Sequence, residues 1–318
     1  MSKIRTAVIG AGSFGRNHVR VCRQMEQADL VAIVDTDPNR AGDAAAQTGC
    51  AAFTDVTELN GKVDAAIVAT PTSTHAEIAC PLLDAGIDVL VEKPIAPNLE
   101  QARRITDAAA AGGRIVQVGH LERFNPAVQA LRRLVTLPLF FEIHRLSLFS
   151  PRSLDVDVVL DLMIHDIDIV LSLTGRMPDE IRAAGISILS SKVDIANVRL
   201  AFPGGCIANL TASRVSTERV RKIRLFQPSQ YISVDYGRQD VLAFSVRGDQ
   251  EIGFDPVNVE KKEPLKLELE SFFEAVATRR SPEVTGEDSI RALEVALGVL
   301  DRIEEHSRIV AESINQAK

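Results

Sequence analysis

The first 120 residues alternate short apolar runs, rich in β-branched residues, with alanine-rich stretches of helical spacing. The apolar runs predict strands within residues 3–12, 29–35, 65–70, 88–94 and 114–120. The stretches between them predict helices within residues 14–25, 38–49, 74–86 and 100–113. Alternation of strands and helices with short connections is typical of βαβ units, so we expect a doubly wound parallel sheet in residues 1–120.

The pattern changes after residue 120. A short helix at Pro126–Leu134 and a strongly apolar helix at Val158–Leu173 are expected, together with many strands that alternate polar and apolar positions. These strands are predicted within residues 139–149, 180–189, 194–202, 206–214, 221–227, 230–236 and 241–247, and further helices within 265–280 and 289–307. Such alternation indicates an antiparallel sheet with one covered face. Residues 121–318 are therefore predicted to form an α+β domain on an open, mostly antiparallel sheet.

The first strand runs into a glycine-rich turn, GAGSFG, directly before the first helix. In this setting Gly10 allows the tight turn, Gly12 lets the backbone approach a pyrophosphate, and Gly15 lets the helix pack closely on the sheet. A phosphate would bind the exposed N–H groups at the helix N-terminus, beside Ser13 and Phe14. The context predicts a Rossmann dinucleotide-binding domain, with an ordinary glycine-rich turn as the alternative.

An acidic residue completes this motif. Asp35 ends the second strand, at the spacing where a carboxylate accepts hydrogen bonds from both hydroxyls of the adenosine ribose. The same charge would repel the 2′-phosphate of NADP, although Arg40 lies close enough in sequence to bind such a phosphate. The motif therefore predicts NAD as the cofactor, with NADP as the less favoured alternative.

The apolar helix VVLDLMIHDIDIVLSL carries a line of polar residues at intervals of three or four, which share one helix face. The line consists of Asp157, Asp161, His165, Asp168 and Ser172. A solvated face is one alternative, but the line contains no basic residue. A metal site is another, but a single imidazole stands among hard oxygens, and we expect no metal. We interpret the line as catalytic residues that face a cleft.

Composition and charge narrow the class of protein. A net charge of −7, from 36 basic and 43 acidic residues, gives no basic surface for nucleic acid. The first residues lack the apolar core and cleavage site of a signal peptide, and no apolar run is long enough for a bilayer. Four scattered cysteines without a CxxC pair favour reduced thiols. We expect a cytoplasmic protein with neither nucleic-acid nor membrane partners.

Five segments together resemble the glucose–fructose oxidoreductase / inositol dehydrogenase / MocA (Gfo/Idh/MocA) family of NAD(P)-dependent oxidoreductases. They are AVIGAGSFGRNH, ATPTSTHAEIA, VLVEKPIA, VGHLERFNP and DLMIHDID, in the order of the family. EKP followed by DxxxHxxD is the most specific feature. The resemblance implies a Rossmann domain followed by an open sheet that forms the substrate wall and the interface of a homo-dimer or homo-tetramer.

The resemblance also assigns expected roles to single residues. Lys93 of EKP, with Asp161 and His165 of DxxxH, is implied to be catalytic. The segments that line the nicotinamide half of the cofactor site supply Thr70, Pro71, Thr72, His75, Glu92 and Lys93. A segment that usually faces substrate supplies Arg123 and Asn125. His120 joins these substrate-binding candidates because it ends the fifth predicted strand, near the expected nicotinamide.

The expected chemistry is the oxidation of a secondary alcohol, which needs a base and a hydride acceptor held close to the carbinol carbon. His165 has an ordinary pKa near neutrality and can take the hydroxyl proton. Lys93 would hydrogen-bond the same oxygen, and either residue could be the formal base. Asp161 could orient one of them or bind a sugar hydroxyl. Asp168 is expected only to pair with a basic residue.

The spellings GHLERFNP and DLMIHDID look most like family members that oxidise nucleotide sugars. They imply an NAD-dependent dehydrogenase whose substrate is a nucleotide amino sugar such as UDP-N-acetylglucosamine, oxidised from the 3-hydroxyl to the 3-ketone. Arg152 could contact a phosphate of such a substrate, or be a surface arginine. An inositol or free aldose dehydrogenase is one alternative. A non-catalytic dinucleotide sensor is the other, but a sensor would need only the glycine loop and Asp35.

Overall fold

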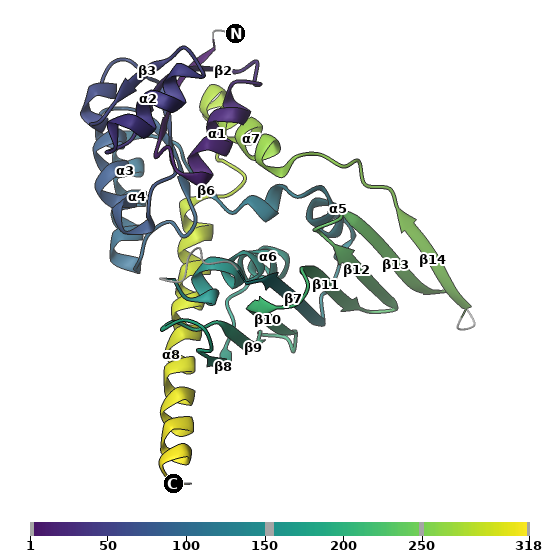
Figure 1. The fold of residues 1–318 in the computed structure, drawn as a ribbon. Coiled ribbons are helices and arrows are strands. Elements are labelled where there is room, and N and C mark those ends of the chain that lie inside the picture. Colours follow the sequence, from purple (N-terminus) through teal and green to yellow (C-terminus); the bar gives the residue numbers. More distant parts are fainter. Residues whose placement is uncertain (1–2, 150–155, 248–250, 317–318) are drawn as a thin grey trace. The chain divides into compact units, whose positions relative to one another are not determined.

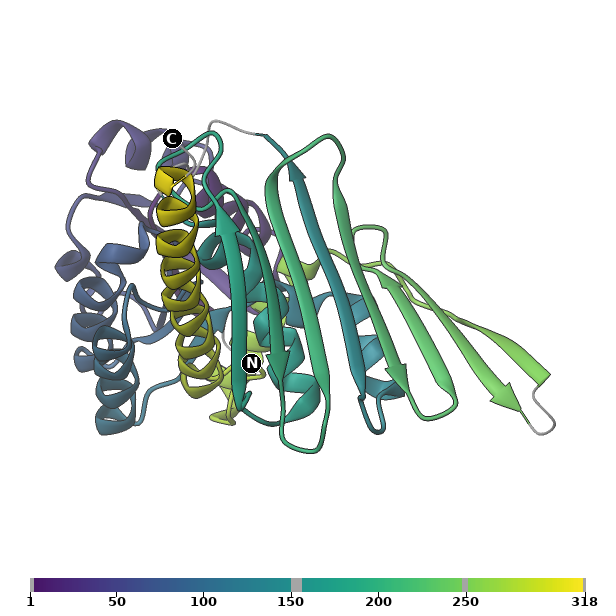
Figure 2. The same ribbon diagram turned by 90° about the horizontal axis from the view of Figure 1, so that it is seen from below.

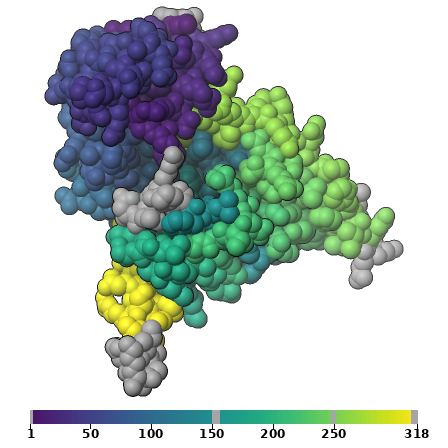
Figure 3. Space-filling model, in the orientation of Figure 1, coloured from purple at the N-terminus to yellow at the C-terminus, as the bar shows by residue number. Residues whose placement is uncertain are grey.

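The computed structural model describes residues 3–149, 156–247 and 251–316, and it divides into two compact units (Figure 1). The first unit consists of Met1–Leu121 and Glu263–Ile290, and the second of Glu122–Lys262 and Arg291–Lys318. Figure 3 shows the surfaces of these segments, coloured from purple for the first residues through teal and green to yellow for the last.

One segment changes domain relative to the sequence analysis, which placed everything after residue 120 in the second domain. Residues 263–290 return to the first unit. The reason is the helix α7 (Pro264–Thr278), whose Leu269, Phe272 and Phe273 are buried in the core of the first unit beside Val8 of β1. Burial of these large apolar side chains stabilises the packing of α7 in the first unit, although α7 lies far from β1 along the chain.

The first unit is built on a six-stranded sheet. Its strands are β1 (Ile4–Ile9), β2 (Ala28–Val34), β3 (Ala51–Phe53), β4 (Ala65–Val68), β5 (Asp88–Glu92) and β6 (Val116–Gly119). Their order is β3-β2-β1-β4-β5-β6, and every neighbouring pair is parallel. The predicted doubly wound Rossmann sheet is thus confirmed. Its order reverses between β1 and β4, which is where ligands of such sheets bind.

Local signals in the sequence explain where the helices of this unit begin and end. The helices besides α7 are α1 (Ser13–Cys22), α2 (Pro38–Ala46), α3 (His75–Asp84) and α4 (Leu99–Gly112). The side chain of Asp37 caps α2, and that of Asn98 accepts a hydrogen bond from the backbone of Gln101 to cap α4. Helix α4 ends at Gly113, whose φ of 58° is left-handed and suits glycine.

The second unit is built on an eight-stranded sheet. Its strands are β7 (Phe140–Leu148), β8 (Glu180–Ile186), β9 (Ile195–Ala201), β10 (Ile207–Ser216), β11 (Val220–Gln227), β12 (Gln230–Asp235), β13 (Asp240–Arg247) and β14 (Glu251–Val257). The order is β14-β13-β12-β11-β7-β10-β9-β8, and only β7 and β10 pair in parallel. The predicted mostly antiparallel sheet is confirmed.

Two strands were not predicted. The edge strand β14 contains Gly253 and Pro256, which both argue against a strand in a sequence. Proline is tolerated at the edge of a sheet because no further strand needs its missing N–H. The other, β3, has only three residues, too few to show any alternation.

One face of the eight-stranded sheet is covered and the other is open. Helices α5 (Pro126–Leu134), α6 (Ile164–Thr174) and α8 (Gly286–Gln316) contribute side chains to its core, and Figure 2 looks onto the face that none of the described helices covers. On β7 the alternation is direct: Phe141 and Ile143 are fully buried, whereas Glu142 and His144 point to the open face. This alternation places the core under the sheet.

Two other expectations, on the cysteines and on membrane spans, can be compared with the structure of the described residues. The cysteines Cys22, Cys50, Cys80 and Cys206 are all free thiols. None of the helices in the described ranges combines the length and the hydropathy that a membrane span requires.

Candidate active site

Residues predicted to bind the cofactor or the substrate follow five strands of the parallel sheet. The glycine loop follows β1, Asp35 follows β2, Thr70 follows β4, Lys93 follows β5 and His120 follows β6. Because these strands are parallel, their carboxyl ends lie at one edge of the sheet. The topology therefore gathers the candidate cofactor residues of the first unit along a single edge.

The glycine loop combines two packed glycines with an open one. A Cβ on Gly10, whose φ is +93°, would lie 2.5 Å from the carbonyl oxygen of Ala69. A Cβ on Gly15 would lie 1.7 Å from the carbonyl oxygen of Gly10. Gly12 has no atom within 4 Å of the equivalent position, and no side chain caps the N-terminus of α1. The turn and packing roles are confirmed, and the open space with uncapped N–H groups fits a pyrophosphate.

Asp35 ties the glycine loop to the end of β2. Its Oδ2 accepts a hydrogen bond from Ala11 N at 2.7 Å, and its Oδ1 accepts one from Asp37 N at 2.9 Å. The carboxylate is largely buried. Arg40 is exposed and forms an ion pair with Asp37, with Nε and Oδ2 3.3 Å apart. At this edge the sheet thus presents an anchored negative charge, which fits ribose hydroxyls.

The segment after β4 is fixed by a buried histidine. The Nε2 of His75 lies 3.0 Å from the carbonyl oxygen of Thr70, and its Nδ1 lies 3.1 Å from that of Pro94. The imidazole thus joins the loop after β4 to the loop after β5. Burial lowers the pKa of His75, against the opposing effect of the carbonyls and Glu92. Pro71 and Thr72 lie in the same loop, where Thr74 hydrogen-bonds the Thr70 hydroxyl at 2.9 Å.

Glu92 and Lys93 end the fourth predicted strand, β5. Glu92 Oε1 lies 2.7 Å from His18 Nε2, and its Oε2 accepts a hydrogen bond from Lys93 N at 3.2 Å. Burial alone would raise the pKa of Glu92, but His18 and Lys93 lower it below its ordinary value. Gly119 is needed beside it, because a Cβ there would lie 3.0 Å from Glu92 Oε2. Lys93 itself is partly exposed.

The apolar helix is not the continuous α-helix that the sequence analysis assumed. Residues Val159–Met163 form a π-helical turn, η4, and α6 begins only at Ile164. Asp157 lies ahead of the helix, where its carboxylate accepts a hydrogen bond from Val193 N at 2.9 Å. Because a π turn inserts an extra residue, the residues before it leave the face predicted for them. Spacing alone could not show this turn.

The polar line divides by exposure. Asp161, within the π turn, and His165, on the first turn of α6, are partly exposed. Asp168 is buried and forms an ion pair with Arg123, with Nε and Oδ2 3.8 Å apart. The expectation that Asp168 pairs with a basic residue is confirmed. Of the acidic and basic residues of the polar line that lie on the helix, only Asp161 and His165 are therefore accessible to solvent.

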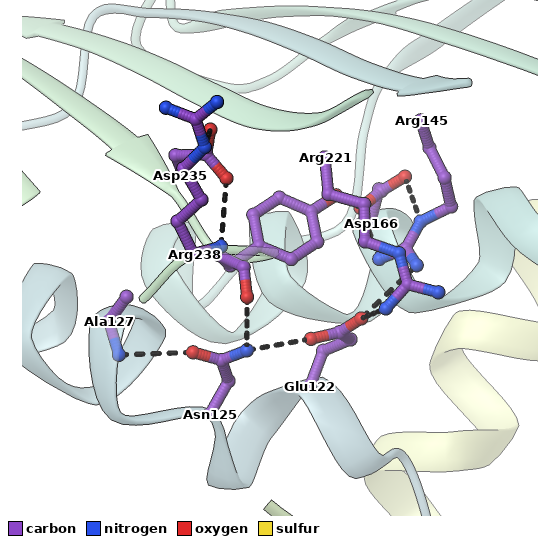
Figure 4. Close-up of polar contacts among 9 residues, drawn as sticks. Glu122, Asn125, Ala127, Arg145, Asp166, Arg221, Asp235 and Arg238 are labelled. Atoms are coloured by element: carbon purple, nitrogen blue, oxygen red, sulfur yellow. Dashed lines mark hydrogen bonds and ion pairs between the residues drawn. The ribbon is translucent and has the colours of Figure 1, made fainter. Parts of the chain in front are cut away.

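A third aspartate of this helix, Asp166, was left outside the predicted line, yet it carries the strongest pairing. Arg145 of β7 binds it through Nε at 2.9 Å and Nη2 at 3.0 Å, and also binds Glu122 through Nη1 at 3.2 Å (Figure 4). The hydroxyl of Tyr236 donates to Asp166 at 2.7 Å. Arg145, Asp166 and Tyr236 are all almost fully buried. We call Glu122, Arg145, Asp166 and Tyr236 the buried network.

The buried network fixes the helix beside His165. Burial would lower the pKa of Arg145, but Asp166, Tyr236 and Glu122 raise it well above the ordinary value. The sequence did carry a signal for this site, because Arg145 occupies an inward position of the alternating strand β7, where an apolar residue is expected. A buried arginine implies buried carboxylates, although their positions cannot be told from spacing.

Three predicted substrate residues have firm internal contacts. Arg123 pairs with Asp168 as described. Asn125 caps α5 through Oδ1 and donates from Nδ2 to Glu122 and to the carbonyl oxygen of Tyr236 (Figure 4). His120 is fully buried, with Nε2 3.0 Å from the hydroxyl of Ser289. Contact with substrate stays a prediction for all three. Arg152 lies outside the described residues.

Comparisons with known proteins agree with this architecture. A model of an oxidoreductase family with an NAD-binding Rossmann fold, GFO_IDH_MocA, matches residues 4–120, and a model of the GFO/IDH/MocA C-terminal domain matches residues 145–228. UDP-N-acetylglucosamine 3-dehydrogenase from Acidithiobacillus ferrooxidans is 36% identical over 96% of this chain and 98% of its own length. This chain belongs to the Gfo/Idh/MocA family.

Another relative is less similar to this chain. The scyllo-inositol 2-dehydrogenase (NAD(+)) of Bacillus subtilis is 27% identical over 93% of this chain and 92% of its own length. A solved structure of the Acidithiobacillus ferrooxidans enzyme matches with a TM-score of 0.91, at 36% identity over 96% of this chain and 99% of that one. An oxidoreductase domain protein from Kribbella flavida, at 22% identity and a TM-score of 0.87, shows the shared fold.

Membership in the Gfo/Idh/MocA family makes the chain an oxidoreductase with a nicotinamide dinucleotide cofactor. When bound, the dinucleotide supplies the hydride acceptor or donor. The glycine loop and Asp35 are the residues that would hold its pyrophosphate and ribose. The sequence analysis missed Glu268, which lies beside Glu92 together with His18. An acid among Leu265, Leu269 and Phe272 on one helix was the available signal.

Proposed function

We propose that this oxidoreductase oxidises a nucleotide amino sugar, UDP-N-acetylglucosamine, from the 3-hydroxyl to the 3-ketone. The observation that carries the proposal is the end-to-end likeness to the Acidithiobacillus ferrooxidans 3-dehydrogenase, at 36% identity over almost the whole of both chains. The inositol dehydrogenases among the relatives support a second candidate, an inositol as substrate.

Three residues divide the chemistry in this proposal. Lys93 Nζ donates a hydrogen bond to the reacting oxygen and stabilises the negative charge that develops there. His165 takes the hydroxyl proton, because an imidazole of near-neutral pKa is the natural base at this pH. Asp161, in the π turn before His165, orients the base or binds a neighbouring sugar hydroxyl. Lys93 stands on the first unit and the other two on the second, so their joint action belongs to the proposal.

For the cofactor we propose NAD rather than NADP. Asp35 is held by two backbone N–H groups, so its carboxylate cannot turn away from a 2′-phosphate without losing both hydrogen bonds. Arg40, which the sequence analysis named as a possible partner of a 2′-phosphate, already pairs with Asp37 at the surface. A phosphate placed there would meet a fixed negative charge, whereas ribose hydroxyls would donate to it.

The proposal predicts rapid reduction of NAD⁺ with UDP-N-acetylglucosamine and little with NADP⁺. Absorbance of the reduced nicotinamide should be followed over UDP-sugars, inositols and free aldoses, with both dinucleotides offered separately to each. Turnover confined to inositols would replace the first candidate by the second. Tight dinucleotide binding without turnover on any of them would favour the sensor. The same kcat/KM for NADP⁺ as for NAD⁺ would contradict the assignment of Asp35.

We also propose a homo-dimer or homo-tetramer formed through the open face of the eight-stranded sheet. Aromatic side chains cross this face from β7 to β14: Phe140, Phe226, Tyr231, Phe244 and Phe254, with neighbouring ring centroids 4.9–5.9 Å apart. Phe226 is 39% exposed and Phe254 53%. A row of exposed aromatic rings is typical of an interaction surface.

A charged substitution on this face should therefore dissociate the proposed dimer or tetramer. We expect light scattering to give a dimer or tetramer for the wild type and a smaller species for Phe226→Glu. Circular dichroism of the variant checks that its fold persists. A monomeric wild type at micromolar concentration would contradict the proposal.

A further inference from the structure

The first unit buries an acid that no described residue satisfies. Glu268 of α7 is 0% exposed, and neither of its carboxyl oxygens has a hydrogen-bond partner within the described ranges. An ionised carboxylate left in this state costs several kcal/mol. Burial, followed by the charge of Glu92, raises the pKa of Glu268 well above its ordinary value. The neutral acid is the form that this environment favours.

The neutral acid has a neighbour that can accept its proton. Atoms of the Glu268 carboxyl, the Glu92 carboxyl and the His18 imidazole all lie within 4.8 Å of one another. His18 and Lys93 lower the pKa of Glu92 against the effect of burial, which favours its charged form. His75 of α3 also interacts with the Glu92 carboxylate. One acid of the pair therefore favours the neutral form and the other the charged form, as in two carboxyls that hold one proton.

A shared metal ion fits this cluster less well. His18 Nε2 and Glu92 Oε1 are only 2.7 Å apart, which is the length of a direct hydrogen bond. Two ligands of one tetrahedral zinc ion, each about 2.0–2.1 Å from the metal, would stand roughly 3.3 Å apart. Moreover, the cluster offers three ligands of which two already contact each other. A hydrogen-bonded proton explains the spacing of His18 and Glu92 without any displacement.

We propose that Glu268 is a positioning residue: a neutral carboxylic acid that shares one proton with Glu92 and, with His18, holds the end of β5 that carries Lys93. Glu92 is then bound on three sides, by His18, by Glu268 and by the backbone N–H of Lys93. Gly119 leaves the space that the Glu92 carboxyl occupies, because a Cβ there would lie 3.0 Å from Oε2. The positioning role rests on the proposed function of Lys93, whereas the proton sharing does not.

The proton is tested without any substrate. Infrared difference spectra between the wild type and Glu268→Gln should show the carbonyl stretch of a buried, protonated carboxyl that the variant has lost. Glu270→Gln is the matched control, since Glu270 lies on the same helix but is partly exposed beside Lys266. The band should survive in this control. Its absence from the wild type at neutral pH would overturn the proposal.

Thermal unfolding gives a second readout. A raised folded-state pKa stabilises the fold below about pH 4, where the acid is neutral in both states, and this stability is lost as the pH rises toward the folded pKa. The melting temperature of Glu268→Gln, relative to the wild type at the same pH, should therefore rise as the pH increases above about 4. A difference independent of pH would overturn the proton sharing. So would one equivalent of bound metal in the purified wild type that Glu268→Gln lacks.

The positioning role is tested by turnover. Glu268→Leu is neutral but cannot donate, so we expect kcat to fall about tenfold because the Lys93 end of β5 shifts. Glu268→Gln can donate an N–H to Glu92 and should recover most of that loss. Equal kcat values in the two variants would refute positioning. If no sugar is turned over at all, the proposed function fails, while the infrared and melting results still decide the proton.

Discussion

Replacing Lys93 by methionine abolishes measurable turnover, by at least about 100-fold in kcat, and leaves the dissociation constant of NAD nearly unchanged. This is the expected result because methionine keeps the length of the side chain but removes the N–H donor that stabilises the developing alkoxide. The glycine loop and Asp35, which would hold most of the dinucleotide, are untouched. Stopped-flow kinetics and titration of NAD measure the two quantities separately.

His165→Asn tests the other half of the proposed chemistry. Loss of the base should lower kcat by about 10²- to 10⁴-fold and remove the acidic limb of the pH–rate profile. Lys62→Met and His306→Asn serve as matched controls, because Lys62 is exposed, His306 is partly exposed, and both lie outside the proposed site and the open sheet face. Near-wild-type rates in either Lys93→Met or His165→Asn would show that the catalytic assignment is wrong.

Replacing Arg145 by methionine should lower the free energy of unfolding by about 3–5 kcal/mol. The side chain is 2% exposed, and its removal leaves the carboxylate of Asp166 buried without its cation, while Glu122 keeps its contact with Arg221. Denaturant melts followed by circular dichroism measure the change.

An exposed ion pair provides the comparison. Arg302→Met breaks the contact between Arg302 and Glu305 of α8, whose atoms are 2.8 Å apart, away from the open sheet face. Solvent screens such a pair, so the loss should be much smaller than that of Arg145→Met. If Arg145→Met costs no more than Arg302→Met, the buried network does not hold the second unit together. On the expected outcome, adding Asp166→Asn to Arg145→Met should lower the free energy of unfolding by little more, because Asp166 has already lost its cationic partner.

Local patterns in the chain were sufficient for most of the fold. Proline at the first helical position and Asn125 as the cap define α5, whose predicted bounds Pro126–Leu134 match the structure. The β-branched runs and the turn at Gly10 define the parallel sheet in the same way. These features depend on residues a few positions apart, so the sequence displays them directly. Strand β14 escaped because its proline is acceptable only at a sheet edge, which is a property of the whole sheet.

The candidate site was predictable only in part, for a related reason. Lys93 follows a predicted strand and His165 lies in a recognisable motif, so their positions could be inferred from the chain alone. The π turn at Asp161 and the pairing of Arg145 with Asp166 could not, because both depend on how β7 packs against the helix. Partners distant in sequence meet through strand register and helix packing, which no local spacing encodes.

The sequence by itself therefore determined the class of fold, the dinucleotide loop and the family, since each rests on short-range periodicity or on motifs. The tertiary structure alone decided which charges are buried and with what partners. Glu268 is the clearest case: its position on an amphipathic helix is ordinary in the sequence, and only the fold buries it beside Glu92 and His18. Burial, which sets the cost of a charge, is a property of the packed molecule.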